Sequence, residues 1–496
     1  MTRRAQLLAA LVTVMLMTSL AAWAQDPPIA ASPADIVYPP LEFEPPSPEE
    51  SRTELPGGIP CFVVEDHSVP VATLGLSFRA GSFDDPAGKE GLASVAMQLL
   101  RMGGTQSMSP DELASELERL AIDVGASASS RTLTVSLSCL SEDLPRAVEI
   151  LAEMIRSPRV DEGRLELLKA QTLEGLRHRL DSPNQVAQLY AEQILYRGHP
   201  AARIVTAESV AAITVDDIRD FLSSALDPDS LVVDMGGDVS RDRVAELLAP
   251  LLQGWEPTGF QPAAIPSDLD PLVPGVYVID VASNQAVIIA TQPGMSRHDP
   301  LYDPEFYVLR VANMVLGGGF SSRLTQRIRV QEGLAYVVGA QGNSNVGYPG
   351  QQAMVALVDA QSAARACQIM AEELTAISTT PPSPEETQRA KQGLFGTWVG
   401  FFESPSSIAR DYAALLLDEM PLDFYITWYE KTEQPEPEVV TEVVARRAPA
   451  SEIRWVIAGP ADMLTAEPGE GPSLADLGPV TVIRPGDPTG PVALPE

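Results

Sequence analysis

The sequence predicts an α+β protein of two tandem homologous domains, each with a mainly antiparallel or mixed sheet and helices packed on one face. Three observations support this class: an internal repeat, strands grouped in pairs between helices, and a proline-rich break near the middle of the 496 residues. Strands that follow each other in pairs favour an antiparallel or mixed sheet over a doubly wound parallel one. The length fits two or three domains.

The internal repeat consists of short segments that recur in the same order, displaced by about 214 residues. Val124-Gly125-Ala126 recurs as Val338-Gly339-Ala340, and the strand-like residues 71–78 recur as 286–291. After each of those strands comes a helix that ends at consecutive glycines. One short match could be chance, but a constant order and offset indicate the duplication of a unit of about 200 residues.

Each unit is expected to run strand, strand, helix, helix, strand, strand, further helices and a closing strand. In residues 133–139, apolar and polar side chains alternate with the period of two that marks a half-buried strand. An amphipathic helix is predicted to begin after Ser141, which has the residue type of a helix cap. The closing strands are predicted at 231–236 and 453–459.

The N-terminal residues 1–24 have the features of a signal peptide. Arg3 and Arg4 precede an apolar stretch, which ends at the small-residue cleavage site Ala22-Trp23-Ala24. This stretch is short for a membrane helix, and no other stretch is long enough to span a bilayer. We therefore expect an exported protein with no membrane span in the mature chain, periplasmic in a Gram-negative host and secreted otherwise.

Composition predicts the remaining boundaries. Residues 25–50, rich in Pro and Glu, are expected to form an extended arm. The prolines and glycine within 256–272 are typical of a linker between two halves of similar size. The two domains are therefore predicted at 51–255 and 273–464, and the Gly/Pro-rich residues 465–496 are predicted as a flexible tail.

Composition also excludes several classes of function. The 67 Asp and Glu residues outnumber the 34 Lys and Arg residues, and the resulting net charge of −33 repels nucleic acid. The four histidines include no pair one helical turn apart, and the sequence contains neither a nucleophile elbow nor a phosphate-binding loop motif. Cys61 and Cys139 lie in strand-like segments and are either buried neighbours or a disulfide, whereas Cys367 is expected in a core.

The second half contains segments that resemble a known peptidase family. Residues 316–324 and 333–336 resemble the C-terminal-domain signature of the pitrilysin/insulinase zinc peptidases, which are also called inverzincins. That family includes the mitochondrial processing peptidase and the core proteins of the bc1 complex. Residues 79–81 and 103–104 agree with the family in the first half, so the resemblance covers roughly 50–462.

The resemblance aligns the family's zinc motif, H-x-x-E-H, with residues 94–98. Ser94 and Gln98 then occupy the two ligand positions and Met97 the general-base position, while the third ligand position falls on Glu174. A catalytic zinc ion needs three protein ligands, and a methionine cannot accept a proton from water. The chain is therefore expected to bind no metal or other cofactor and to hydrolyse no peptide alone.

The second half keeps a different part of the family's machinery. By the resemblance, Arg329 and Tyr336 are the catalytic pair that reaches the substrate at a partner's zinc ion. The same signature implies a substrate-binding loop at Gly317, Gly318 and Gly319, where the absence of Cβ would let the backbone approach a peptide.

In bacterial two-chain members of the family, one chain binds zinc and the other carries the Arg/Tyr pair. The resemblance thus implies the non-zinc subunit of an exported heterodimeric metallopeptidase, with peptide substrates and a homologous zinc-binding partner that contains H-x-x-E-H. Two other functions remain open. The chain could be a scaffold or assembly protein, as the bc1 core proteins are, or a peptide-binding, chaperone-like pseudopeptidase that works alone or as a homodimer.

Overall fold

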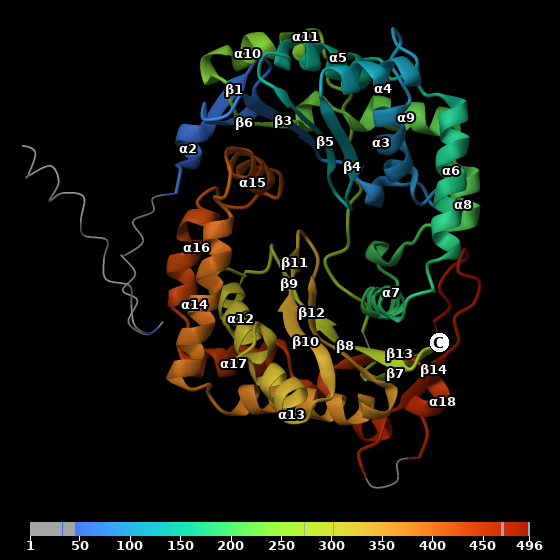
Figure 1. Ribbon diagram of the computed structural model, residues 1–496, viewed down its shortest axis with the longest axis vertical. Coiled ribbons are helices and arrows are strands. Elements are labelled where there is room, and N and C mark those ends of the chain that lie inside the picture. The colour runs from blue at the N-terminus through green and yellow to red at the C-terminus, as the bar shows by residue number, and fades with distance from the viewer. Residues whose placement is uncertain (1–31, 33–44, 272, 301, 468–470, 495–496) are drawn as a thin grey trace, which may run out of the picture. The chain divides into compact units, whose positions relative to one another are not determined.

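The computed structural model describes residues 32, 45–271, 273–300, 302–467 and 471–494, nearly all within one compact unit, Pro46–Glu496 (Figure 1). The predicted signal peptide, residues 1–24, lies outside the described residues, as does most of the predicted arm. The arm's last residues differ from the prediction, because they form a helical turn, α2 (Pro48–Ser51), instead of an extended segment. The side chain of Ser47 caps this turn by accepting a hydrogen bond from the Glu50 N–H.

The first half forms a six-stranded mixed sheet in the order β1-β2-β6-β3-β5-β4. β2 and β6 run parallel, and the other neighbouring strands are antiparallel. The apolar residues of the predicted alternating strand are all buried in β5. The strands of this sheet are β1 (Arg52–Leu55), β2 (Ile59–Glu65), β3 (Val71–Phe78), β4 (Asp123–Ala128), β5 (Leu133–Leu140) and β6 (Val232–Gly237).

The second half forms a six-stranded sheet in the order β10-β12-β8-β13-β7-β14, with β7 parallel to both β13 and β14. A separate pair of two-residue strands, β9 (Met295–Ser296) and β11 (Ser344–Asn345), lies outside this sheet. The strands of the large sheet are β7 (Gly275–Asp280), β8 (Gln285–Pro293), β10 (Ala335–Gly342), β12 (Gln351–Asp359), β13 (Arg454–Gly459) and β14 (Val480–Ile483).

The predicted duplication is confirmed by the topology. Five strands of the first sheet, β2, β6, β3, β5 and β4, correspond in order and direction to β7, β13, β8, β12 and β10 of the second. The repeated Val-Gly-Ala segments occupy equivalent places in β4 and β10, which are edge strands. The fold is therefore two copies of one α+β unit, as the sequence predicts.

Helices separate the strands in both halves. The first half contains α3 (Leu92–Met102), α4 (Pro110–Arg119), α5 (Leu144–Arg156), α6 (Glu162–Arg177), α7 (Pro183–Leu195), α8 (Ala207–Ala212), α9 (Val215–Ala225), α10 (Val244–Leu247) and α11 (Ala249–Leu252). The second half contains α12 (Tyr302–Gly317), α13 (Ala363–Thr379), α14 (Pro384–Gly400), α15 (Pro405–Leu417), α16 (Phe424–Glu433), α17 (Pro437–Arg447) and α18 (Ala461–Leu464). Several begin at a Ser-Pro step in which the serine accepts a backbone hydrogen bond and proline takes the first helical position, as in α4, α14 and α15.

One face of the first sheet is covered by helices of its own half, as predicted, and the other face by a helix of the second half. Cys61 and Val63 of β2 face a core that includes buried residues of α3 and α5. Phe62, between them, faces the opposite side and packs against Ile408 and Tyr412 of α15. Side chains on the two faces of β2 therefore pack into two different cores, and only one of these cores is formed by helices of its own half.

The exchange is reciprocal. Val186, Tyr190 and Ile194 of α7 share a core with residues of β8 and β13 in the second sheet. Where α15 meets β6, a Cβ built on Gly236 would overlap the backbone of Ser406, so this contact requires a glycine. No sequence pattern predicted that the two halves would exchange a helix.

The prediction of a flexible tail at 465–496 is wrong for the residues that the structure describes. β14 pairs in parallel with β7, and its alternating valines and threonine fit a strand at a sheet edge. Further along, the carbonyls of Thr489 and Gly490 accept hydrogen bonds from the Ala207 N–H and the Arg179 side chain of the first half. The proline and glycine content predicted a flexible segment, but pairing of β14 with β7 and these hydrogen bonds order it.

The three cysteines are buried and free. Cys61 lies in β2 and Cys139 in β5, and two strands separate them in the sheet, which is roughly 14 Å at about 4.8 Å per strand. A disulfide needs Cα atoms less than about 7 Å apart, so the disulfide alternative is wrong. Both cysteines are buried, as the other alternative expected, but with two strands between them they are not neighbours. Within the described ranges, no helix combines the length and the apolar character required to cross a bilayer.

Candidate functional site

The degenerate zinc motif lies on α3, whose start is fixed by a buried carboxylate. Asp85 accepts hydrogen bonds from the N–H groups of Gly91 (2.7 Å) and Ala93 (2.8 Å) at the first turn. On the exposed side of the helix, the side-chain amide of Gln98 donates a hydrogen bond to the hydroxyl of Ser94 at 3.2 Å. The side chains at the family's two zinc-ligand positions are thus hydrogen-bonded to each other. Met97, at the general-base position, is completely buried in the core.

The third ligand position is occupied by a surface carboxylate with partners of its own. Glu174, on α6, accepts a hydrogen bond from Arg177 at 2.8 Å and lies 3.2 Å from a ring nitrogen of His178. The hydrogen bond from Arg177 lowers the pKa of Glu174, so this carboxylate is held as part of an exposed ion pair. Across the described residues, no group of three or more His, Cys, Asp or Glu side chains could hold a metal ion. The side chains at the motif positions do not fit a zinc site.

A cavity of about 450 Å³ lies beside Ser94, between residues of both halves. Its lining includes Asp85, Glu192, Tyr196 and Tyr348. Burial raises the pKa of Asp85 to about 6, although the two N–H groups oppose the shift, and burial also raises the pKa of Glu192. Sequence reasoning missed this cavity; an Asp shortly before a predicted helix start was the available signal.

The structure brings the predicted Arg/Tyr pair together and adds a third residue to it. Arg329 lies in a π-helix (Thr325–Gln331), and Tyr336 lies in β10. The guanidinium carbon of Arg329 is 5.0 Å from the centre of the Tyr336 ring and 5.1 Å from that of Phe320. Both rings are largely open to solvent, with 77% of Tyr336 and 75% of Phe320 exposed. Phe320 was not predicted, although a single aromatic residue in a Gly/Ser loop was a visible signal.

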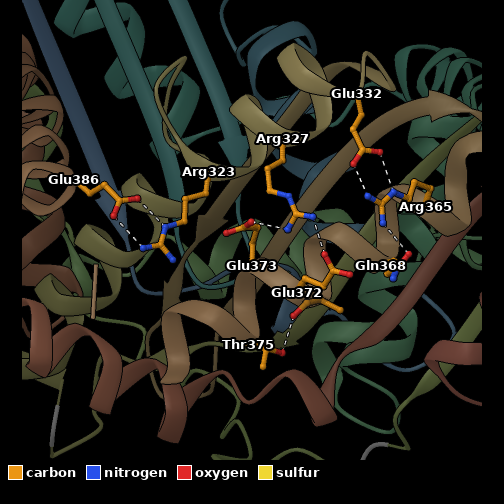
Figure 2. Close-up of polar contacts among 10 residues, drawn as sticks. Arg323, Arg327, Glu332, Arg365, Gln368, Glu372, Glu373, Thr375 and Glu386 are labelled. Carbon is orange, nitrogen blue, oxygen red and sulfur yellow. Dashed lines mark hydrogen bonds and ion pairs between the residues drawn. The ribbon is translucent and has the colours of Figure 1, made fainter. Parts of the chain in front are cut away.

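Ion pairs fasten the π-helix to the helices behind it (Figure 2). Arg323 makes a two-pronged pair with Glu386 of α14 at 2.8 and 3.1 Å, and this pairing lowers the pKa of Glu386. Arg327 pairs with two neighbouring carboxylates of α13, Glu372 at 2.7 Å and Glu373 at 2.8 Å. These contacts are partly buried, which makes them more useful for positioning than exposed pairs.

Arg329 itself is left without a carboxylate among the described residues. The acidic residue that follows it in the chain, Glu332, pairs with Arg365 of α13 instead (Figure 2). The guanidinium therefore rests between two aromatic faces while its N–H groups stay available to a ligand. Chemically, this arrangement can bind a carbonyl oxygen or an anion.

The glycine loop differs from its predicted role at two of three positions. A Cβ on Gly317 would overlap the backbone nitrogen of Ala340 in β10, and one on Gly318 would overlap Met314 of α12. These two glycines are required by packing within the chain, so they do not provide an open approach for a peptide. Gly319 faces open space, and its predicted contact with a peptide stays a prediction.

The Arg/Tyr pair does not belong to the cavity beside Ser94. Neither Arg329 nor Tyr336 lines that cavity, whereas Asn343, which follows the end of β10, does. Tyr336 stands near the start of the same strand, which spans roughly 20 Å at about 3.3 Å per residue. The structure thus separates the degenerate zinc motif from the pair that would have to act with it.

Comparison with known proteins agrees with this geometry. The model of the insulinase family (peptidase family M16) matches residues 61–208, and the model of the peptidase M16 inactive domain matches residues 212–394. A "non-peptidase homolog YmxG" of Helicobacter pylori is 29% identical over 293 residues, which cover 58% of this chain and 65% of that protein. An uncharacterized zinc protease of Streptomyces coelicolor is 28% identical over 302 residues, or 58% of this chain and 63% of that protein. The matches thus span less than two thirds of these relatives.

Solved structures show the same fold. The crystal structure of a peptidase M16 inactive domain from Pseudomonas fluorescens superposes with a TM-score of 0.74 at 24% identity, covering 82% of this chain and 98% of that one. A protease from Helicobacter pylori superposes with a TM-score of 0.70 at 18% identity, with the same coverage. Because the two family models follow each other along the chain and together match most of both halves, this chain belongs to the M16, or insulinase, family of peptidases.

Proposed function

We propose that this chain is the non-zinc subunit of an exported two-chain zinc metallopeptidase and that Arg329 and Tyr336 complete the active site of a homologous partner. The observation that carries the proposal is the exposed stack of Phe320, Arg329 and Tyr336, which lies apart from the chain's own degenerate motif. The described residues hold no zinc site beside this exposed pair, which supports a role in which a second chain supplies the zinc. We propose export because residues 1–24 have the features of a signal peptide. The exported form would be the mature chain, which lacks these residues.

The chemistry of the pair suits peptide hydrolysis. When bound to the partner, zinc would supply the activated water. Tyr336 would donate its phenolic hydrogen to the oxygen of the scissile carbonyl as negative charge develops there. Arg329 is permanently charged and presents several N–H donors in one plane, so it would bind a peptide carbonyl or the anionic intermediate.

The proposal is tested by reconstitution with a homologue that contains H-x-x-E-H and is encoded beside this chain or copurifies with it. Tyr336→Phe and Arg329→Ala should each lower kcat by about 10²- to 10³-fold, the usual loss for one oxyanion donor. Size-exclusion chromatography and the zinc content of the complex should not change. Matched controls are Tyr277→Phe, whose hydroxyl donates to the Val273 carbonyl, and Arg219→Ala, which pairs with Asp216 at the surface.

The same experiment separates the alternatives. If the two variants assemble and turn over at the parent rate, the active-site role is wrong and a scaffold role takes its place. If the chain forms no complex with a zinc-binding homologue and only binds peptides, it works as a pseudopeptidase. The name "non-peptidase homolog" given to the Helicobacter pylori relative supports an inactive chain, but it does not distinguish among these three roles.

A further inference from the structure

We propose that a cavity beside Trp255, in the first half of the chain, binds a small organic ammonium ion, that is, a positive charge carried on an apolar body. We call it the Trp255 cavity. It has a volume of about 510 Å³ and is lined by residues 56–57, 59, 228–229, 245, 249 and 252–257. This goes beyond the proposed function, because neither Arg329 nor Tyr336 lines the cavity. Three features carry the inference: fixed walls, an apolar interior and two carboxylates without partners.

One wall of the Trp255 cavity is fixed by Asp227, a buried side chain that does not line it. Its Oδ1 accepts hydrogen bonds from the N–H groups of Asp229 at 3.1 Å and Thr258 at 3.2 Å. Its Oδ2 accepts from the hydroxyl of Thr258 at 2.8 Å and from the Phe260 N–H at 3.0 Å. The carboxylate therefore joins the turn that contains Asp229 to the chain just after residues 253–257, and both stretches line the cavity.

A second wall is fixed by Arg156, the last residue of α5. Its guanidinium donates hydrogen bonds to the carbonyls of Leu251, Gln253 and Gly254 at 2.9, 3.2 and 2.8 Å. It also lies over the Trp255 ring, 5.5 Å from the ring centre, but Arg156 does not line the cavity. The cavity is therefore formed before a ligand arrives, as small-molecule sites usually are.

The interior of the Trp255 cavity is mainly apolar. Ile59 and Pro228 are buried, and Leu252 and Trp255 are half-buried. Alanines of α10 and α11, two helices that Figure 1 shows beside β1, add small apolar side chains. Small-molecule sites typically have volumes of about 300–1,000 Å³ and mostly apolar and aromatic linings. An apolar group placed here would leave water, which favours its binding.

The charges of the lining favour a cationic ligand. Asp229 and Glu256 are exposed and line the cavity, and no Lys, Arg or His is among the lining residues. Within the described part of the chain, neither carboxylate has a hydrogen bond or an ion pair. Two unpaired carboxylates attract a cation and repel an anion. The apolar interior disfavours a hydrated metal ion, whose ligands are oxygen atoms. An organic ammonium ion fits both parts of the site, because its carbon groups would fill the interior while its charge would face the carboxylates.

The test uses the full mature chain alone and isothermal titration calorimetry with three probes: benzyltrimethylammonium, benzyl alcohol and tetramethylammonium. Benzyl alcohol has the ring without the charge, and tetramethylammonium has the charge without the ring. Benzyltrimethylammonium should bind at least about tenfold more tightly than either, because it alone uses both the apolar interior and the carboxylates. Equal affinity for the three probes, or no binding of benzyltrimethylammonium at millimolar concentration, overturns the proposal.

Two variants test the place of binding. Asp229→Asn combined with Glu256→Gln should weaken binding of benzyltrimethylammonium by about tenfold and leave the affinity for benzyl alcohol unchanged. Ala245→Arg, at an exposed position of the lining, should abolish binding of benzyltrimethylammonium, because the new side chain brings bulk and a like charge into the cavity. Parent affinity in either variant overturns the proposal.

Matched controls lie on other helices of the first half. Glu208→Gln combined with Asp220→Asn neutralises two exposed carboxylates of α8 and α9, and Ala170→Arg changes an exposed alanine of α6. Both should bind the probes as the parent chain does. If they lose as much affinity as the cavity variants, the cation binds through the net negative charge of the chain and the proposal is wrong. No step needs a zinc-binding partner, so this result and the active-site role of Tyr336 can fail independently.

Discussion

The guanidinium carbon of Arg329 lies 5.0 Å from the centre of the Tyr336 ring, although the two residues belong to a π-helix and to a β-strand. The ring attracts the cation that lies over its face, and a guanidinium in this position still has N–H groups that can donate hydrogen bonds. The π-helix is held by the ion pairs of Arg327, which lies in it, and of Arg323, which lies two residues before its start. These contacts hold the backbone and one face of the cation near this position before any ligand arrives, which favours electrostatic stabilisation of a developing charge.

Phe320 should act as a positioning residue for Arg329. Replacing it with alanine removes one of two aromatic faces, and an exposed cation–π contact is worth about 0.5–1 kcal/mol. In the reconstituted complex, Phe320→Ala should therefore lower kcat by roughly two- to fivefold, whereas Phe320→Tyr should keep the parent rate. The measurement is steady-state kinetics of matched complexes. A loss that Phe320→Tyr does not restore would point to a role other than stacking.

The purified chain should contain well under one zinc ion per molecule and show no peptidase activity. The reason is chemical: Ser94 and Gln98 bond to each other, Met97 is buried, and Glu174 is paired with Arg177. Metal analysis by mass spectrometry measures this directly. Stoichiometric zinc that disappears in Glu174→Ala but persists in the control Glu149→Ala, another exposed carboxylate paired with an arginine, would show that the motif still binds metal.

Substitution by alanine should lower the free energy of unfolding much more at Gly317 than at Gly319. In Gly317→Ala, the new Cβ meets the backbone of Ala340, which cannot move without shifting β10, so the free energy of unfolding should fall by about 1–3 kcal/mol. Gly319→Ala adds a methyl group to open space and should stay within about 0.5 kcal/mol of the parent chain. Urea unfolding followed by circular dichroism compares the two. Similar losses in both variants would mean that the loop does not pack on β10 as described.

Much of the fold could be predicted because its signals are local or repeated. The period-two alternation of residues 133–139 predicted the strand β5. The Val-Gly-Ala repeat indicated that β4 and β10 are equivalent strands. The pairing of Arg329 with Tyr336 was implied by family resemblance, and the structure brings the two side chains into contact. What could not be predicted depends on distant segments. The exchange of α7 and α15, the ordering of β14 and the packing role of Gly317 each require a neighbour far away in the sequence.

The burial of an ionisable side chain where the two halves meet also could not be predicted, because it depends on distant segments. Asp234 lies in β6 opposite Phe62 of β2 and Gly75 of β3, on the face that α15 covers. A Cβ on Gly75 would overlap the Asp234 carboxylate, so the absent side chain makes room for the acid. Burial raises the pKa of Asp234 to about 7; Arg410 of α15 opposes the shift and Asp411 adds to it.

Stability should therefore depend on pH through Asp234. An aspartate in the unfolded chain has a pKa of about 3.9, so between about pH 4 and pH 7 the folded chain holds a proton that the unfolded chain has released. The contribution of this group to the free energy of unfolding falls as the pH rises through that window and is constant above it. Asp234→Asn should abolish this part of the slope and stabilise the chain at about pH 8 by on the order of 2–4 kcal/mol, with little effect at about pH 4. Urea unfolding across this range measures the difference, with the exposed Asp216→Asn on α9 as the control. If the Asp234→Asn curve stays parallel to that of the parent from pH 4 to pH 8, Asp234 does not titrate in this window, and the contact between β6 and α15 is insensitive to its charge.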